Sequence, residues 1–203
     1  MKKILPIFSY IFHPIFIPIL ACLFYFFVND SYFSYSKYEV YLVLMQVTIL
    51  TFLIPISFFY LLRSLGKIDS IMVSELSQRK FPLLIQIVLL LVLINKGTTE
   101  DRIPELYYYF LAGLISTILA LIFLFAKIKA SLHMVGIASL LLFVIGISIH
   151  NHTNFLISIA VLTLLTGIVA SSRLEMKAHD FKELTLGFLI GIIPQIALWH
   201  FWL

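Results

Sequence analysis

Charged residues are scarce in this sequence. They make up only 12% of its 203 residues, whereas hydrophobic residues make up 62% and the mean hydropathy is +1.07. Soluble domains carry about 25% charged residues, so this composition excludes an ordinary soluble protein. The apolar residues form repeated runs of about 20 residues, the length that a helix needs to cross a bilayer. The ten-residue alternation typical of membrane β-strands is absent. The sequence therefore predicts an all-α integral membrane protein.

Several chemical motifs are also missing. The single cysteine, Cys22, excludes a disulfide within the chain. There is no glycine-rich phosphate loop, no Gly-x-Ser-x-Gly elbow and no zinc motif of Cys and His. His150 and His152 form a His-x-His pair, but zinc requires about three or four ligands, and we interpret the pair as part of a polar turn. We therefore expect neither a metal site nor a cofactor. No long polar stretch separates two parts of the chain, which predicts a single domain over residues 1–203.

Seven apolar segments are predicted to span the membrane as a helix bundle. They are residues 4–28, 40–62, 81–94, 106–126, 131–149, 155–170 and 184–203. The third is too short unless its helix extends back through Glu75, so six spans with one re-entrant segment is the alternative. The first resembles a signal sequence, but its apolar run of about 25 residues is too long for a signal-peptide core. We expect a retained helix that bends at Pro14 and Pro18, with His13 as an interfacial or packing residue.

The positive charges predict an orientation. Of the 14 lysines and arginines, only Lys37, Lys96 and Arg102 fall on the face opposite the N-terminus. The positive-inside rule therefore places the N-terminus in the cytoplasm and the C-terminus outside, in a bacterial inner membrane. The net charge of +4 is concentrated at a membrane face, which favours anionic membrane lipids and excludes nucleic acid as a partner.

Three polar clusters fall on the same predicted face. They are residues 74–82, 127–136 and 171–183, each just before or at the start of an apolar segment. Two crossings separate each cluster from the next, so the chain returns to one side every time. The topology therefore allows all three clusters to converge on one site.

The spacing in the third cluster indicates chemistry. Glu183 follows His179 by four residues, one helical turn, and Gly187 and Gly191 continue the same stripe. A carboxylate at this distance can orient an imidazole and fix its tautomer. Glycines at this spacing allow a neighbouring helix to approach closely. Arg173, on the approach to this helix, offers a fork of donors suited to phosphate oxygens.

This cluster resembles the third signature of the type 2 phosphatidic acid phosphatase superfamily. That signature consists of Ser-Arg, five residues, His, three residues and an acid. Ser172, Arg173, His179 and Glu183 match it, with Glu where the family usually has Asp. The chain thus resembles a small, divergent bacterial member of the family.

The other two signatures are matched in part. Ser131 and His133 retain two residues of the second, Pro-Ser-Gly-His. Arg79 and Pro82 resemble the end of the first, in which six residues separate a lysine from Arg-Pro. Met72 occupies the place of that lysine. The resemblance covers residues 74–191, in the family's order.

The resemblance implies metal-independent hydrolysis of a lipid or polyprenyl phosphate, or a pyrophosphate, through a phosphohistidine. By analogy His179 is the nucleophile, Glu183 orients it and His133 protonates the leaving oxygen. The phosphoryl oxygens would be held by Arg79, Arg173, Ser131 and Lys80. Lys80 and Lys127 are candidates to replace the missing lysine. Because that lysine is absent and the second signature is altered, the alternative is a non-catalytic membrane module that binds lipid phosphate or a partner protein.

Overall fold

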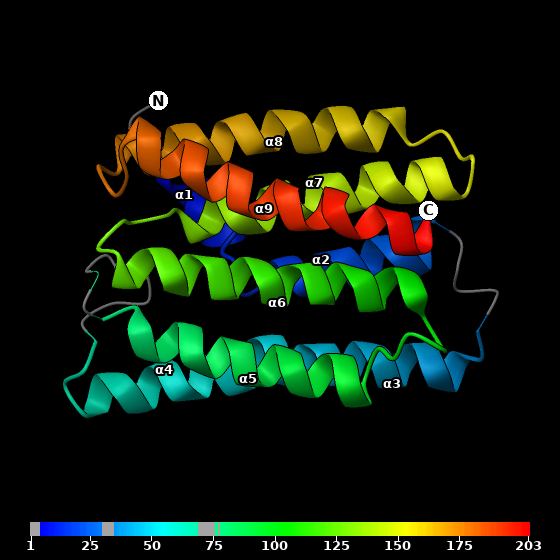
Figure 1. Cartoon of the computed structure of the whole chain (residues 1–203), viewed down its shortest axis with the longest axis horizontal. Helices are drawn as coiled ribbons and strands as arrows, with labels where there is room; N and C mark the ends of the chain where they lie inside the picture. The colour runs from blue at the N-terminus through cyan, green and yellow to red at the C-terminus, as the bar shows by residue number, and fades with distance from the viewer. Residues whose placement is uncertain (1–4, 30–34, 69–75, 77) are drawn as a thin grey trace.

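The computed structural model describes residues 5–29, 35–68, 76 and 78–203, and these form helices, turns and loops but no strand. The helices lie side by side along the long axis of the molecule (Figure 1). In chain order they are α1 (Leu5–Ile11), α2 (Ile17–Leu23), η1 (Phe24–Val28), α3 (Lys37–Thr48), η3 (Ile49–Leu53), α4 (Ile54–Ser64), α5 (Lys80–Lys96), α6 (Pro104–Phe125), α7 (Leu132–His150), α8 (Leu156–Glu175) and α9 (Phe181–Trp202). The predicted all-α bundle is confirmed.

Five stretches of the described chain are long and apolar enough to cross a membrane. They are α6, α7, α8, α9 and the continuous helix Lys37–Ser64, formed by α3, η3 and α4. This supports the prediction of a membrane protein, but the count of about seven spans is not supported. α5 has 17 residues and begins at Lys80, so it does not extend back through Glu75 as expected, and Glu75 itself lies outside the described residues. The first segment is divided.

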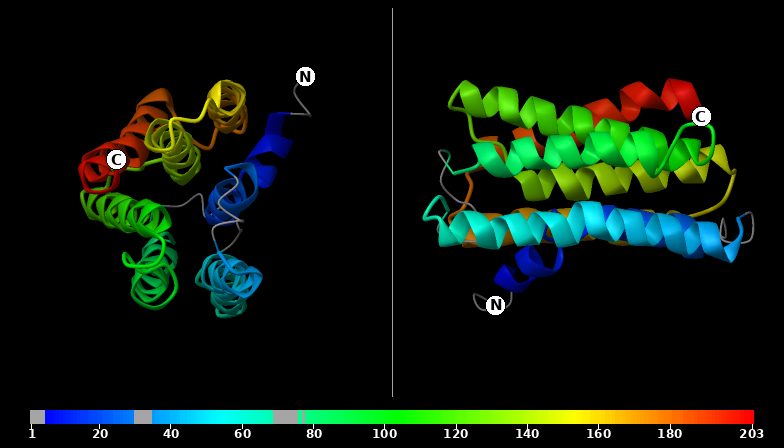
Figure 2. Two further views of the ribbon diagram at one scale, coloured as in Figure 1. Left: turned by 90° about the vertical axis from the view of Figure 1, so that its right-hand side faces the viewer. Right: turned by 90° about the horizontal axis from the view of Figure 1, so that it is seen from below.

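The division of the first segment follows from its prolines. α1 ends at Ile11 and α2 begins at Ile17, with Pro18 in its first turn. Pro14 has no N–H to donate and its ring would collide with the preceding turn, which disfavours a helix that continues through it. The predicted bend is therefore a complete break, and His13 lies within it. Figure 2 shows that α1 turns away from the direction shared by the long helices.

α7 and α9 form the most extensive helix contact in the fold. A Cβ placed at Gly187 would overlap the carbonyl oxygen of Ser131, and one at Gly191 would lie 2.5 Å from the carbonyl oxygen of Val135. Only glycine lets the two backbones approach this closely, as small-residue stripes do in membrane bundles. The prediction of a close helix contact along this stripe is confirmed.

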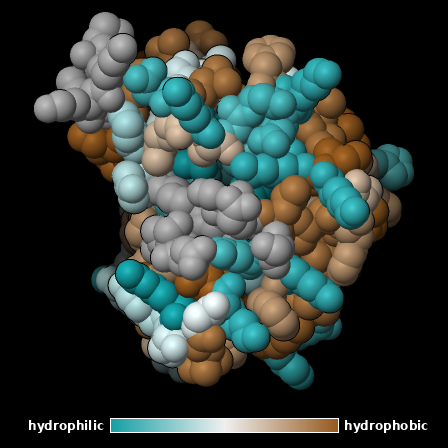
Figure 3. All heavy atoms as spheres, turned by 90° about the vertical axis from the view of Figure 1, so that its left-hand side faces the viewer, coloured by the Kyte–Doolittle hydropathy of each residue, from teal (hydrophilic) through white to brown (hydrophobic). Residues whose placement is uncertain are grey.

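The two ends of the bundle differ in character. The end of α4, the start of α5 and the α6–α7 and α8–α9 junctions lie at one end, and the C-terminus lies at the other (Figure 1). Polar side chains gather on the first end, and apolar side chains surround them on the flanks of the bundle (Figure 3). The described residues of the three polar clusters thus belong to one end of the molecule, hereafter the polar end.

Candidate functional site

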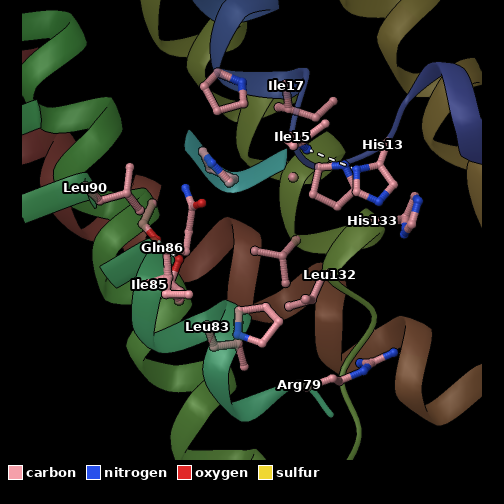
Figure 4. A pocket seen from close by; sticks show the side chains of 18 of the residues that line it. His13, Ile15, Ile17, Arg79, Leu83, Ile85, Gln86, Leu90, Leu132 and His133 are labelled. Atoms are coloured by element: carbon pink, nitrogen blue, oxygen red, sulfur yellow. Dashed lines mark hydrogen bonds between the residues drawn. The ribbon is translucent and has the colours of Figure 1, made fainter. Parts of the chain in front are cut away.

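A cavity of about 250 Å³ opens among α2, α4, α5, α6 and α7 near the polar end. Its titratable lining residues are His13, Arg79, Tyr109, His133, Arg173 and His179. Most of the remaining wall is apolar, with Phe59, Leu83 and Phe110 among its residues. Figure 4 shows Arg79 and His133 on one side of this space and Leu90 on the other. The cavity therefore joins a cationic end to an apolar interior.

The start of α9 builds the His179–Glu183 pair. The helix begins at Phe181, two residues later than His179, because the Asp180 carboxylate caps it by accepting from the backbone N–H of Glu183 over 2.8 Å. His179 nevertheless reaches Glu183, and its Nδ1 donates to Oε2 over 2.6 Å. This bond places the ring proton on Nδ1 and leaves a lone pair on Nε2.

Nε2 of His179 faces a guanidinium group. Nη2 of Arg79 lies 3.5 Å from it, while Nη1 of Arg79 donates to the carbonyl oxygen of Ala130 over 2.8 Å. Arg79 is 5% exposed. A hydrogen bond also joins the α6–α7 and α8–α9 junctions: Nζ of Lys129 donates to the carbonyl oxygen of Ala178 over 2.8 Å. These contacts hold the starts of α5, α7 and α9 together.

Arg173 supplies a second buried cation. We expected it on the approach to the last helix, but it lies in the final turn of α8 and is 1% exposed. Burial and the charge of Arg173 lower the pKa of Arg79 to about 10, while Glu183 acts in the opposite direction. Two buried guanidinium groups that repel each other would be stabilised by an anion bound between them.

The environment keeps His179 neutral. Burial lowers the pKa of its imidazole well below the usual range, and the positive charges of Arg79 and Lys129 add to this effect. The positive charge of Arg173 acts in the same direction. A neutral imidazole with its proton on Nδ1 has a lone pair on Nε2, and that atom faces the guanidinium group of Arg79.

The start of α7 contributes His133 and Ser131. Nε2 of His133 donates to the carbonyl oxygen of Ser9 in α1 over 3.0 Å. Ser131 is fully buried, and its backbone N–H donates to the carbonyl oxygen of Glu183 over 3.1 Å. Its Oγ has no hydrogen-bond partner within the described part of the chain. Ser131 is not in the cavity wall, but the next residue, Leu132, is. The hydroxyl is thus an unused donor and acceptor beside the site.

The structure therefore brings together Arg79, His133, Arg173 and His179 around one cavity, with Glu183 behind His179 and Ser131 next to the wall. Lys80 does not join them. It is exposed, and its Nζ lies 5.5 Å from the ring centroid of Phe125. Met72, at the position of the missing lysine, lies outside the described residues.

His13, which the sequence suggested as an interfacial or packing residue, also lines the cavity. The ring of His13 lies 5.2 Å from that of His133, centroid to centroid, at an interplanar angle of 86°. The sequence did contain an indication of this role, because a titratable side chain inside an apolar membrane segment suggests a functional site. Proximity to His133 could not be read from the sequence, because 120 positions separate the two residues.

The chain matches no protein-family model, no curated protein and no solved structure.

Proposed function

We propose that this protein is a membrane-embedded phosphatase that hydrolyses a lipid or polyprenyl phosphate, or a pyrophosphate, through a phosphohistidine. One observation carries the proposal: a neutral His179, oriented by Glu183, presents Nε2 to a buried guanidinium at the end of an apolar cavity. The match to the third signature of the type 2 phosphatidic acid phosphatases leads to the same reaction. No metal or cofactor takes part in the proposed steps.

The reaction has two steps. Nε2 of His179 attacks phosphorus, and the bond from phosphorus to the leaving oxygen breaks as His133 donates a proton to that oxygen. Glu183 stabilises the positive charge that develops on the imidazole. Water then attacks the phosphohistidine, releases inorganic phosphate and restores His179. Because His133 already donates Nε2–H to Ser9, the proton that it transfers is the one on Nδ1.

The buried cations match the charge of a phosphoryl group in transfer. Negative charge is spread over its equatorial oxygens, so donors fixed around them stabilise the transition state. Arg79 and Arg173 would supply guanidinium forks, and the Ser131 hydroxyl a further donor. Lys80 lies too far out to contribute, so the two arginines would carry the role of the missing lysine.

The apolar part of the cavity favours a lipid over a soluble phosphate ester. Side chains of α4, α5 and α6 would surround the first part of a hydrocarbon chain while the phosphate lies among the arginines and histidines. A soluble sugar phosphate would leave this wall without a partner.

We further propose the seven-span topology, with the polar end in the cytoplasm of a bacterial cell. In this arrangement α5 and the broken first segment also cross the bilayer. A Lys177→Cys variant in a Cys22→Ser background places one thiol at the polar end. An impermeant thiol reagent should label it only after the cells are lysed. Labelling in intact cells would show that the polar end faces outward, opposite to the proposed orientation.

A non-catalytic module remains the second candidate. Lys80 lies outside the cavity, and no other lysine among the described residues lines it, so the phosphate contacts of the resembled family are incomplete. Such a protein would bind lipid phosphate among the arginines without turnover.

Phosphate release by the purified protein decides between the two. The substrates would be phosphatidic acid, phosphatidylglycerophosphate and undecaprenyl pyrophosphate, each with a chelator present. We expect release from at least one substrate, its loss in His179→Ala, and an acid-labile phosphoprotein in rapidly quenched wild-type samples. His200→Ala, which changes a histidine outside the cavity, is the matched control and should retain activity. If no substrate is hydrolysed by folded protein that still binds lipid phosphate, the non-catalytic module is correct.

A further inference from the structure

The break between α1 and α2 places a second imidazole beside His133. The backbone N–H of Ile15 donates to Nδ1 of His13 over 3.4 Å, and this contact orients the ring toward the cavity (Figure 4). Because Nδ1 accepts this bond, the proton of a neutral His13 lies on Nε2. The ring is half-buried and lines the cavity.

The same segment also holds His133. The carbonyl oxygen of Ser9 accepts from Nε2 of His133, and the Ser9 hydroxyl lies 2.6 Å from that of Ser172 in α8. α1 is therefore fixed against both α7 and α8, and its end delivers His13 to the face of the cavity where His133 lies. The two rings meet edge to face, 5.2 Å apart.

We infer that His13 and His133 share one proton, and that His13 is a positioning residue that sets the pH range in which His133 can protonate the leaving oxygen. This role rests on the proposed phosphatase reaction. Two imidazolium ions at this separation in a poorly solvated cavity repel each other, so the second proton binds much more weakly than the first. Such a pair titrates as a unit.

The charged neighbours do not remove this coupling. Two arginines line the same cavity, Arg173 from α8 and Arg79 from the start of α5. His179, which is bonded to Glu183, lines it from the start of α9, and Tyr109 lines it from α6. The arginines keep their charge at every pH of interest and tyrosine stays neutral below about pH 10. Because His179 is held neutral by its surroundings, the proton that the leaving oxygen takes up comes from the His13–His133 pair.

The proton balance of the reaction is unchanged by His13. In the first step the proton on Nδ1 of His133 moves to the leaving oxygen while the N–P bond forms at His179. In the second step water loses a proton as it attacks phosphorus, and that proton returns to the pair. A proton resting on His13 instead leaves His133 neutral and unable to act, so the two imidazoles compete.

Replacing His13 with asparagine removes the competitor. His133 should then hold its proton to higher pH, and the alkaline limb of the kcat/KM profile for phosphatidic acid, or for whichever substrate is hydrolysed, should move up by about one pH unit. His13→Arg places a permanent cation there and should move the same limb down. A purely structural role would lower the rate at every pH without opposite shifts. Identical limbs in wild type and both variants would overturn the inference.

A second measurement does not depend on activity. The ring resonances of His133 in full-length protein labelled with ¹⁵N-histidine report its titration directly, with His133→Gln used for assignment. In His13→Asn its midpoint should move to higher pH, and an unchanged midpoint would also overturn the inference. If the wild type hydrolyses nothing, the proposed function fails, whereas the shared proton is still tested by the titration. Gel filtration of each variant establishes that it is folded.

Discussion

Replacing Gly191 with alanine tests the close contact that positions the site. A Cβ at this position would lie 2.5 Å from the carbonyl oxygen of Val135 and 3.1 Å from Cβ of Ala138. Ordinary van der Waals contact begins at 3.4 Å, so α7 and α9 would have to separate by about 0.9 Å here. The carbonyl oxygen of Val135 belongs to the backbone of α7, so it cannot move aside as a side chain could. Overpacking of this kind costs about 1–3 kcal/mol, which exceeds the gain of up to about 1 kcal/mol in helix propensity.

The melting temperature should fall on the order of 5 °C, because each kcal/mol changes it by about 2–4 °C in a chain of this size. Cys22 is buried and is the only cysteine, so a thiol-reactive fluorophore reports unfolding of the purified protein in detergent. Gly167→Ala is the matched control, since a Cβ there meets nothing within 4 Å. If Gly191→Ala melts at the same temperature as this control, the close contact between α7 and α9 is refuted.

Three further predictions concern the polar end. The pKa of His179 is lower in the folded protein than in the unfolded chain, so the unfolded chain binds more protons below about pH 6.5. The free energy of unfolding should therefore fall by about 1–2 kcal/mol between pH 7.5 and pH 5. Circular dichroism melts of wild type and His179→Asn measure this fall, and an equal pH dependence in both proteins would contradict the neutral state of His179. Asp180→Ala should cost about 1 kcal/mol by removing the cap of α9, and Asp180→Asn should restore most of it in the same melts. Arg79→Lys should slow phosphate release by about 100-fold because the guanidinium fork is lost, whereas Lys80→Ala should leave it unchanged; equal losses would place Lys80 in the site.

Much of the fold follows from local composition. Continuous apolar runs of about 20 residues, without the alternation of membrane β-strands, form helices in a bilayer, because a helix satisfies its own backbone groups there. The relation of His179 to Glu183, and the stripe of Gly187 and Gly191, follow from the four-residue helical spacing alone. Counting crossings also placed three distant polar clusters at one end, and their described residues do lie there, although the number of membrane-spanning helices is not supported.

Other features depend on how the helices pack. The sequence predicts a bend at Pro14, but only the tertiary fold shows that the helix breaks there and that the break brings His13 to His133. Lys80 and Arg79 are neighbours in the chain, yet one is buried at the cavity and the other is exposed beside Phe125. The sequence by itself determined the helical membrane class, the His179–Glu183 pair and the end of the molecule where charge gathers, because these depend on hydropathy and on spacing within one helix. The tertiary structure alone decided which side chains enter the cavity, because that depends on the rotation and separation of helices distant in the sequence.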